Sequence, residues 1–114
     1  MAIQYLEIVT PAVEAVCATY ERTHGVTFGD GDPALGGARI ARLSGGGLMG
    51  VRPPLHDAET PVVRPYLLVH DLEAAVTAAE EAGAMVALRS MVLEGHGTCA
   101  IVIQGGIEMG FWQI

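Results

Sequence analysis

Residues 64–75, RPYLLVHDLEAA, decide the fold, because a short apolar run passes there directly into a capped helical pattern. Residues 66–69 are apolar and predict a strand, and Asp71 belongs to the residue types that favour a helix N-cap. Gly83 then stands where a helix would end in the left-handed conformation. Between them, apolar residues recur at three- and four-residue spacing, as on one face of a helix: Leu72, Ala75, Val76 and Ala79.

The same pattern occurs near the start of the chain. Residues 3–9 predict a strand, and Thr10 and Pro11 predict the N-cap and the first position of a helix. Gly25 predicts the end of that helix. One face of the helix carries Val13, Val16, Cys17 and Tyr20.

Each helix is followed by three predicted strands. In the first half one strand starts at Val26, residues 29–33 (GDGDP) form a turn, and further strands cover 38–43 and 48–51. In the second half the strands cover 85–92, 99–103 and 107–112.

The sequence therefore contains an internal repeat of about 60 residues. VEAV at 13–16 matches LEAA at 72–75. We predict a single α+β domain of two βαβββ modules in a pseudo-twofold arrangement. The modules cover about 1–52 and 62–114, and a proline-containing linker covers about 53–61.

The composition excludes several classes of function. Of 114 residues, 51% are hydrophobic and 17% charged, so the chain can bury a core. The formal charge is −7, and the six basic residues are unclustered arginines, so we expect no nucleic-acid partner. No apolar stretch approaches the roughly 18 residues of a membrane span, so we expect no membrane association. An acidic domain suits neutral or cationic small molecules.

The two cysteines, Cys17 and Cys99, are far apart in the chain and belong to no paired motif. We interpret both as small buried hydrophobic residues of a reducing compartment. The first residues run straight into a predicted strand, without the pattern of a signal peptide. We therefore expect a cytoplasmic protein.

Four segments, taken in order, resemble the vicinal-oxygen-chelate superfamily, which contains glyoxalases, bleomycin-resistance proteins and dioxygenases. They are IQYLEI at 3–8, residues 64–75, GHGTCAIV at 95–102 and GIEMGFWQ at 106–113. The resemblance covers essentially the whole chain. It implies two βαβββ modules whose eight mostly antiparallel strands curl around a cleft, usually in a dimer.

The metal-using members of this superfamily take four ligands from the cleft. The resemblance places these positions at Tyr5, Gly50 (to within one residue), Arg64 and Gly110, with Gln4 in place of Tyr5 if the first strand shifts by one residue. Divalent metals prefer imidazole or carboxylate ligands, whereas glycine offers no side chain and arginine a fixed positive charge. The resemblance therefore favours the metal-free branch, and we expect no metal and no other cofactor.

Strand alternation predicts which side chains line the cleft. The candidate ligand-binding residues are Tyr5, Glu7, Arg64, Tyr66 and Trp112. Two interpretations of these residues remain open: they orient a ligand, or Glu7 and Arg64 pair with each other while the tyrosines pack. Trp112 either stacks on a planar ligand or belongs to the core or a dimer interface. No residue is identified as catalytic.

The leading hypothesis is a metal-independent protein that binds small molecules, planar or cationic ones above all, similar to the drug-sequestering resistance members of the superfamily. The alternative is a lyase or isomerase that uses Glu7, with Arg64 steering an anionic intermediate. A third hypothesis is an interaction module whose cleft is filled by side chains. We also expect a homodimer, because the apolar fraction is high and two modules leave sheet edges that need cover.

Overall fold

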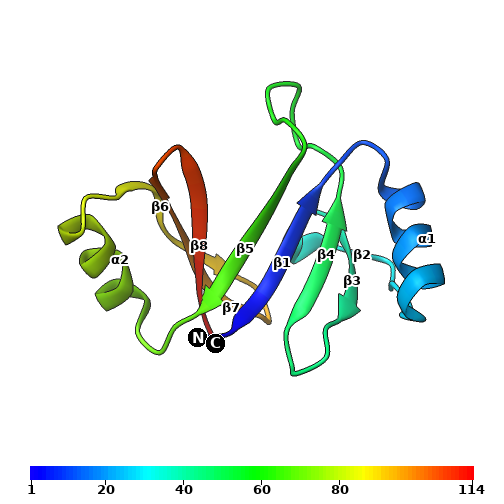
Figure 1. Cartoon of the computed structure of the whole chain (residues 1–114), viewed down its shortest axis with the longest axis horizontal. Helices are drawn as coiled ribbons and strands as arrows, with labels where there is room; N and C mark the ends of the chain where they lie inside the picture. Colours follow the sequence, from blue (N-terminus) through cyan, green and yellow to red (C-terminus); the bar gives the residue numbers. More distant parts are fainter. The chain divides into compact units, whose positions relative to one another are not determined.

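The computed structural model describes all 114 residues, and it contains the order strand–helix–three strands twice (Figure 1). The first series is β1 (Ile3–Val9), α1 (Val13–His24), β2 (Gly31–Asp32), the 3₁₀ turn η1 (Pro33–Leu35), β3 (Ala38–Arg42) and β4 (Leu48–Arg52). The second is β5 (Val62–Leu68), α2 (Leu72–Glu81), β6 (Met85–Leu93), β7 (Gly97–Gln104) and β8 (Ile107–Gln113). The predicted α+β class with two βαβββ modules is confirmed.

The chain forms two compact units with four strands each, and we call these sets of strands the N-terminal and the C-terminal sheet. The N-terminal unit is Tyr5–Val63, and the C-terminal unit is Arg64–Ile114 together with Met1–Gln4. The strand order is β2-β3-β4-β1 in the first and β5-β8-β7-β6 in the second. Within each unit the first and last strands of the series run parallel, whereas the other neighbours are antiparallel.

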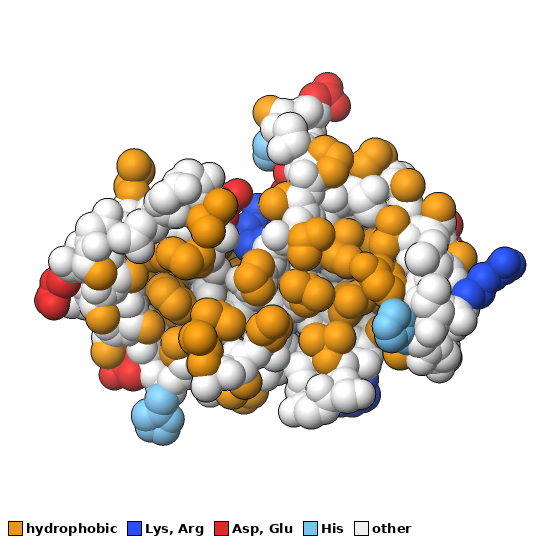
Figure 2. All heavy atoms as spheres, in the orientation of Figure 1, with side chains coloured by type: hydrophobic (Ala, Val, Ile, Leu, Met, Phe, Trp, Pro, Cys, Tyr) orange, Lys and Arg blue, Asp and Glu red, His pale blue; other side chains and the backbone are white.

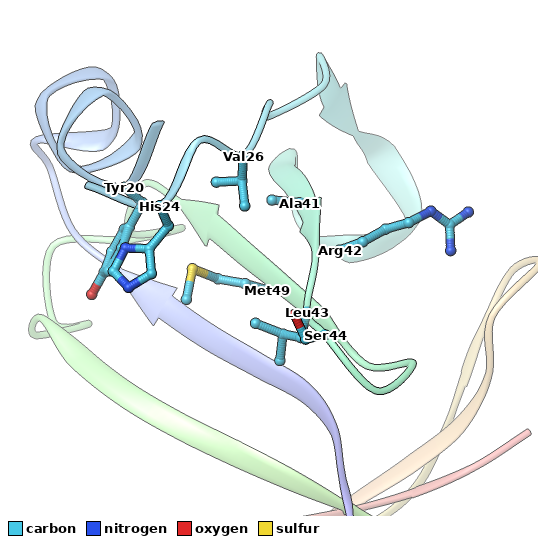
Figure 3. Close-up of a pocket in the computed structure, with 8 residues that line it drawn as sticks. All are labelled: Tyr20, His24, Val26, Ala41, Arg42, Leu43, Ser44 and Met49. Atoms are coloured by element: carbon cyan, nitrogen blue, oxygen red, sulfur yellow. The ribbon is translucent and has the colours of Figure 1, made fainter. Parts of the chain in front are cut away.

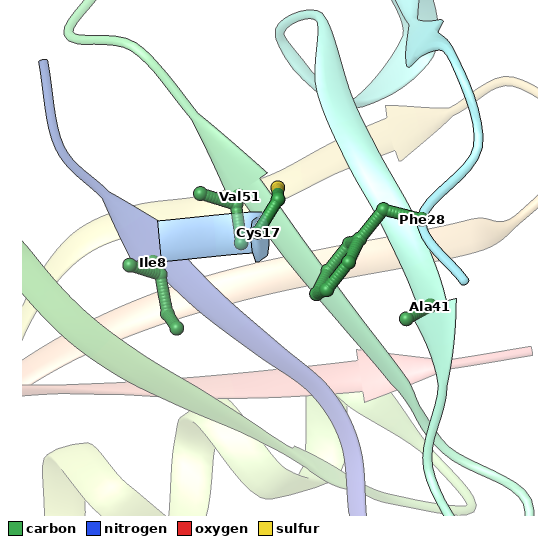
Figure 4. Packing of buried hydrophobic residues seen from close by; sticks show 5 residues of the cluster. All are labelled: Ile8, Cys17, Phe28, Ala41 and Val51. Carbon is green, nitrogen blue, oxygen red and sulfur yellow. The ribbon is translucent and has the colours of Figure 1, made fainter. Parts of the chain in front are cut away.

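Helix α1 covers one face of the N-terminal sheet. The side of the helix that faces the sheet is the one that the sequence predicted. Cys17 lies in a cluster with Ile8, Phe28, Ala41 and Val51 (Figure 4). The other residues of the predicted helix face, Val13, Val16 and Tyr20, pack against this cluster. Gly25 ends the helix with φ 66°, a left-handed conformation that favours glycine, as predicted.

Helix α2 covers one face of the C-terminal sheet in the same manner. Leu72 and Val76 are buried against Ala100 of β7, with Val69, Val86 and Phe111 packed around them. The Asp71 carboxylate accepts a hydrogen bond of 3.1 Å from the Ala74 amide, which confirms the predicted N-cap. Neither helix has the length and apolar character needed to cross a bilayer.

The start of α1 differs from the prediction. The helix begins at Val13, with Ala12 as its N-cap, so Pro11 stands before the helix and not at its first position. The Thr10 hydroxyl accepts a hydrogen bond of 3.1 Å from the Ala12 amide, within the turn that precedes the helix. A threonine–proline pair is equally compatible with such a turn, which is why the sequence placed the helix too early.

The second strand of the first half also differs from the prediction. No strand starts at Val26; the strand is the two-residue β2, inside the segment expected to be a turn. Its Asp32 also accepts a hydrogen bond of 2.9 Å from the Ala34 amide and so caps η1. Pairing with β3 therefore makes this strand, against its turn-forming composition.

Replacement of Asp71 by alanine removes the side-chain cap of α2. We expect Asp71→Ala to lower the free energy of unfolding by about 1 kcal/mol, because an amide at the helix start loses its acceptor. Urea denaturation followed by Trp112 fluorescence measures the change. Asp71→Asn keeps an acceptor oxygen and serves as the matched control, which should lose less than half as much. Equal losses in both variants would show that the cap is not what Asp71 contributes.

Candidate functional site

Each sheet has one face under its helix and a second face turned away from it. Because successive side chains of a strand alternate between faces, the neighbours of the buried Ile8 and Val51 point away from α1. We call this surface the α1-distal face; it carries Tyr5, Glu7, Val9, Gly50 and Arg52. By the same argument from the cluster under α2, the α2-distal face carries Arg64, Tyr66, Ile101, Gly110 and Trp112.

On the α1-distal face, the ring of Tyr5 lies over Gly50. Tyr5 is only 2% exposed. A Cβ at Gly50 would collide with the Tyr5 hydroxyl and would lie 2.8 Å from Cε1 of the ring. Burial is the main cause that raises the pKa of Tyr5 well above its ordinary value of 10.0, and the negative charge of Glu7 is the second cause. Tyr5 is therefore a neutral phenol that needs a glycine beneath it.

Arg52 connects the two carboxylates of this face. Its Nε donates to Glu7 at 2.9 Å, while Nη1 and Nη2 donate to the two oxygens of Glu59 at 2.9 and 2.7 Å. Arg52 is 6% exposed, so the guanidinium is buried together with Glu7. Burial of these charges is tolerated because each is paired and hydrogen-bonded.

Sequence reasoning did not single out Arg52 or Glu59. Arg52 stood at the edge of the predicted linker, before two prolines, and Glu59 stood inside it. One signal was available: Arg52 follows Gly50 by two residues, so strand alternation places both on one face.

The electrostatics of Glu59 follow from this pairing. The hydrogen bonds from Arg52 are the main cause that lowers the pKa of Glu59 from 4.5 to about 2, and the Leu55 amide contributes a further hydrogen bond. In turn, the hydrogen bond to Glu59 is the largest cause that raises the pKa of Arg52 above its ordinary value. One guanidinium and two carboxylates leave a net charge of −1 in this group.

The α2-distal face repeats the arrangement of ring over glycine. Tyr66 stands directly opposite Gly110, and a Cβ there would collide with the Tyr66 ring. Tyr66 meets Trp112 edge to face, with ring centroids 5.7 Å apart and an interplanar angle of 82°. Trp112 is 2% exposed, and its Nε1 donates to the carbonyl of His96 at 3.1 Å.

Arg64 is buried beside these rings. Its Nη2 donates to the Glu108 carboxylate at 3.1 Å, and Glu108 keeps 40% of its side chain exposed. The structure therefore gives Arg64 a partner within its own unit, just as it gives Glu7 a partner in Arg52. The expected approach of Glu7 to Arg64 joins residues of different units and stays a prediction.

Beyond the rings and the ion pair of Arg64 with Glu108, the α2-distal face is apolar. Ile101 stands opposite Gly110, and Leu88 of β6 stands opposite Ile101. The outer strand β6 adds two methionines to this face, Met85 and Met91, which are 67% and 45% exposed. The sequence placed these residues in strands but did not indicate that they extend the candidate site. Figure 2 shows hydrophobic side chains over much of the visible surface, with few basic ones among them.

The comparisons with known proteins rest on structure, since the sequence matches no protein-family model and no curated protein. A hypothetical protein, BH1468 from Bacillus halodurans C-125, is 15% identical with a TM-score of 0.76, over 99% of this chain and 94% of that one. Methylmalonyl-CoA epimerase from Mycobacterium tuberculosis is 12% identical with a TM-score of 0.75, over 97% of this chain and 86% of that one. A glyoxalase/bleomycin resistance protein/dioxygenase superfamily member from Vibrio splendidus 12B01 is 15% identical with a TM-score of 0.69, over 96% of this chain and 97% of that one.

The chain has the vicinal-oxygen-chelate fold. Structures similar to it include an epimerase and a member of the glyoxalase/bleomycin resistance/dioxygenase superfamily, as the sequence resemblance led us to expect. At these identities the likeness shows the fold alone, and the chemistry must be argued from the side chains of this chain.

The metal ligands of the vicinal-oxygen-chelate fold do not fit this chain. In the N-terminal unit the two corresponding positions hold a neutral, buried Tyr5 and a glycine covered by its ring. In the C-terminal unit they hold Arg64, already bound to Glu108, and a glycine covered by Tyr66. No group of three or more His, Cys, Asp or Glu in the chain could hold a metal ion. The donor set is therefore wrong for a divalent cation.

The contact between Tyr5 and Gly50 can be tested by adding one methyl group. We expect Gly50→Ala to destabilise the protein by about 2 kcal/mol, because the new Cβ forces the Tyr5 ring out of its position. Gly29→Ala is the matched control, since its Cβ would meet no atom closer than 3.9 Å. The double variant Tyr5→Leu/Gly50→Ala should cost less than the two single changes together. Strict additivity in urea denaturation would contradict the contact.

The stability that Glu59 contributes should depend on pH. The folded state lowers the pKa of Glu59 to about 2, so its contribution is complete above the ordinary value of 4.5 and is lost as pH falls toward 2. We expect Glu59→Gln to cost about 2 kcal/mol at pH 7 and progressively less between pH 5 and pH 3. Urea denaturation at each pH measures the difference. The exposed Glu94→Gln is the control, and a difference for Glu59→Gln that stays constant over this range would refute the assignment.

Proposed function

We propose that the protein binds a small organic molecule without a metal ion, and that binding itself is its function. The observation that carries this proposal is the ring over a glycine at the metal-ligand positions of both units. Aromatic rings pack at these positions, where a metal site would need ligands. Aromatic surface with a few fixed polar groups is typical of sites that recognise organic molecules.

The proposed ligand-binding residues are those that the sequence indicated: Tyr5, Glu7, Arg64, Tyr66 and Trp112. The α2-distal face supports a planar, apolar ligand, because rigid rings stand beside exposed methionines that adapt to varied shapes. The formal charge of −7 of the whole chain favours a cationic group on that ligand. We propose sequestration of such a compound, as in drug-resistance proteins, by a cytoplasmic homodimer.

The second candidate is an enzyme, and the likeness to methylmalonyl-CoA epimerase favours it. An epimerase must remove a proton from carbon and return it, which requires a base near the substrate. Glu7 is the carboxylate proposed for that role, with Arg64 steering an anionic intermediate. Arg52 holds Glu7 in a buried ion pair, an arrangement that suits a structural carboxylate better than a base.

Binding can be tested with a planar aromatic cation such as 9-aminoacridine. We expect its addition to raise the melting temperature. At a ligand concentration of one hundred times Kd, binding should raise the free energy of unfolding by about 2.7 kcal/mol. Treatment with a chelator should leave both the melting temperature and this increase unchanged. Met91→Ser should weaken binding several-fold, while Ile107→Ser, on the helix-facing side of the same sheet, should not. A planar cation that binds no better than a flexible anion would contradict the proposal.

The same preparation separates binding from catalysis. When methylmalonyl-CoA is incubated in deuterated water, the protein should not speed the incorporation of deuterium at the substrate carbon above the rate without protein, as judged by mass spectrometry. Incorporation that Glu7→Gln abolishes, in a variant whose melting temperature is retained, would place the epimerase candidate first.

A further inference from the structure

A separate cavity of about 280 Å³ lies on the other side of the N-terminal sheet, under the end of α1 (Figure 3). It exists because α1 ends at His24 while the β3–β4 hairpin continues further along the sheet, so the helix leaves the end of the hairpin uncovered. The side chains that form it come from three segments: Tyr20 and His24 of α1, Val26, and Ala41, Leu43 and Met49 of the hairpin.

The floor of this cavity is apolar. Ala41 is buried in the cluster under α1, and Tyr20, Val26 and Met49 pack against the same cluster. Arg42 borders the cavity, but its side chain points away to the opposite face of the sheet (Figure 3). The cavity therefore extends the core of the unit outward, and a ligand there gains free energy chiefly by displacing water from apolar surface.

Size and shape favour a single aromatic ring. An apolar cavity of about 150 Å³ suffices to bind benzene, so 280 Å³ accommodates one ring with a substituent. The Tyr20 and His24 rings stand on one side, with centroids 6.0 Å apart, and the Met49 thioether faces them (Figure 3). A planar ligand between them would contact an aromatic ring and a polarisable sulfur atom.

The polarity of the site follows from the hydrogen bonds of His24. The Thr23 hydroxyl has one proton, which it donates to the Thr19 carbonyl at 2.8 Å. With that proton used, Thr23 accepts in its 2.7 Å contact with Nδ1 of His24, which corresponds to the imidazole tautomer with its proton on Nδ1. Nε2 is then an acceptor. The negative end of the α1 dipole lies at the same place, which also favours a donor over an anion.

We propose that this cavity is a second ligand site, for a neutral single-ring aromatic molecule that bears a hydrogen-bond donor, as in phenols. It is independent of the proposed function, since its side chains project from the opposite face of the sheet. Ala41 and Met49 face α1, whereas Gly50 and Arg42 face away from it. Such a site lets the N-terminal unit take a phenol while the planar ligand binds elsewhere on the protein.

The test uses p-cresol and two matched probes on protein labelled with ¹³C at the methionine methyl groups. We expect p-cresol to shift the Met49 methyl signal saturably. 4-Methylanisole, which lacks the donor, should bind about tenfold more weakly, and p-toluate, an anion of similar size, should bind least. His24→Phe should remove the preference for p-cresol over 4-methylanisole, while the control His70→Phe should keep it. 9-Aminoacridine should not displace p-cresol.

Two variants that fill the cavity complete the test. Val26→Phe and Leu43→Phe each place a ring where the ligand would lie, and either one should abolish the Met49 shift while the protein stays folded. The proposal is overturned if p-cresol leaves the Met49 methyl unchanged in the wild-type protein. It is also overturned if the shift persists in a folded, filled variant, or if the anion binds as well as p-cresol. None of these results bears on the planar-cation site, which the acridine titration tests separately.

Discussion

The contact of a tyrosine ring with a glycine constrains both units of this protein. In each unit it joins the first and last strands of the series, which run parallel, and in each it leaves no room for a side chain at the glycine. A ligating residue at Gly50 or Gly110 would have to displace a buried ring. The positions at which the sequence resemblance places metal ligands are therefore occupied by aromatic packing in this chain, and a larger residue at either glycine requires a smaller one in place of its tyrosine.

The second constraint on the structure is that its buried charges must be paired. Arg52 neutralises Glu7 of β1 and also binds Glu59, so a single guanidinium links β1, β4 and the segment between β4 and β5. Removal of Arg52 would take away the cation that compensates the buried Glu7 carboxylate. Carboxylates held in this way are hydrogen-bonded to arginine and are not available as ligands of a metal ion. The pairing thus agrees with the ring packing in opposing a metal site and in keeping residual negative charge.

The sequence predicted those features that depend on local periodicity. The helix faces around Cys17 and Val76, the cap at Asp71 and the left-handed Gly25 all follow from spacing and residue type. The features it missed depend on residues distant in the chain. β2 forms only because β3 pairs with it, and Arg52 gains its importance from partners 45 and seven residues away. The two prolines after Arg52 indicated a linker. The residues next to Arg52 in the sequence do not indicate its ion pairs, because these form only in the folded chain.

Strand alternation explains how one small sheet presents two unlike chemistries. Along β4 the side chain of Met49 enters the cavity under α1, Gly50 receives the Tyr5 ring on the opposite face, and Arg52 follows Gly50 on that face. A shift of one residue in the register of β4 would exchange the two faces, and so place the thioether over Tyr5 and the glycine under α1. The parallel pairing of Glu7 with Gly50 therefore specifies both faces of this sheet at once, the contact of Tyr5 with Gly50 on one face and the cavity under α1 on the other.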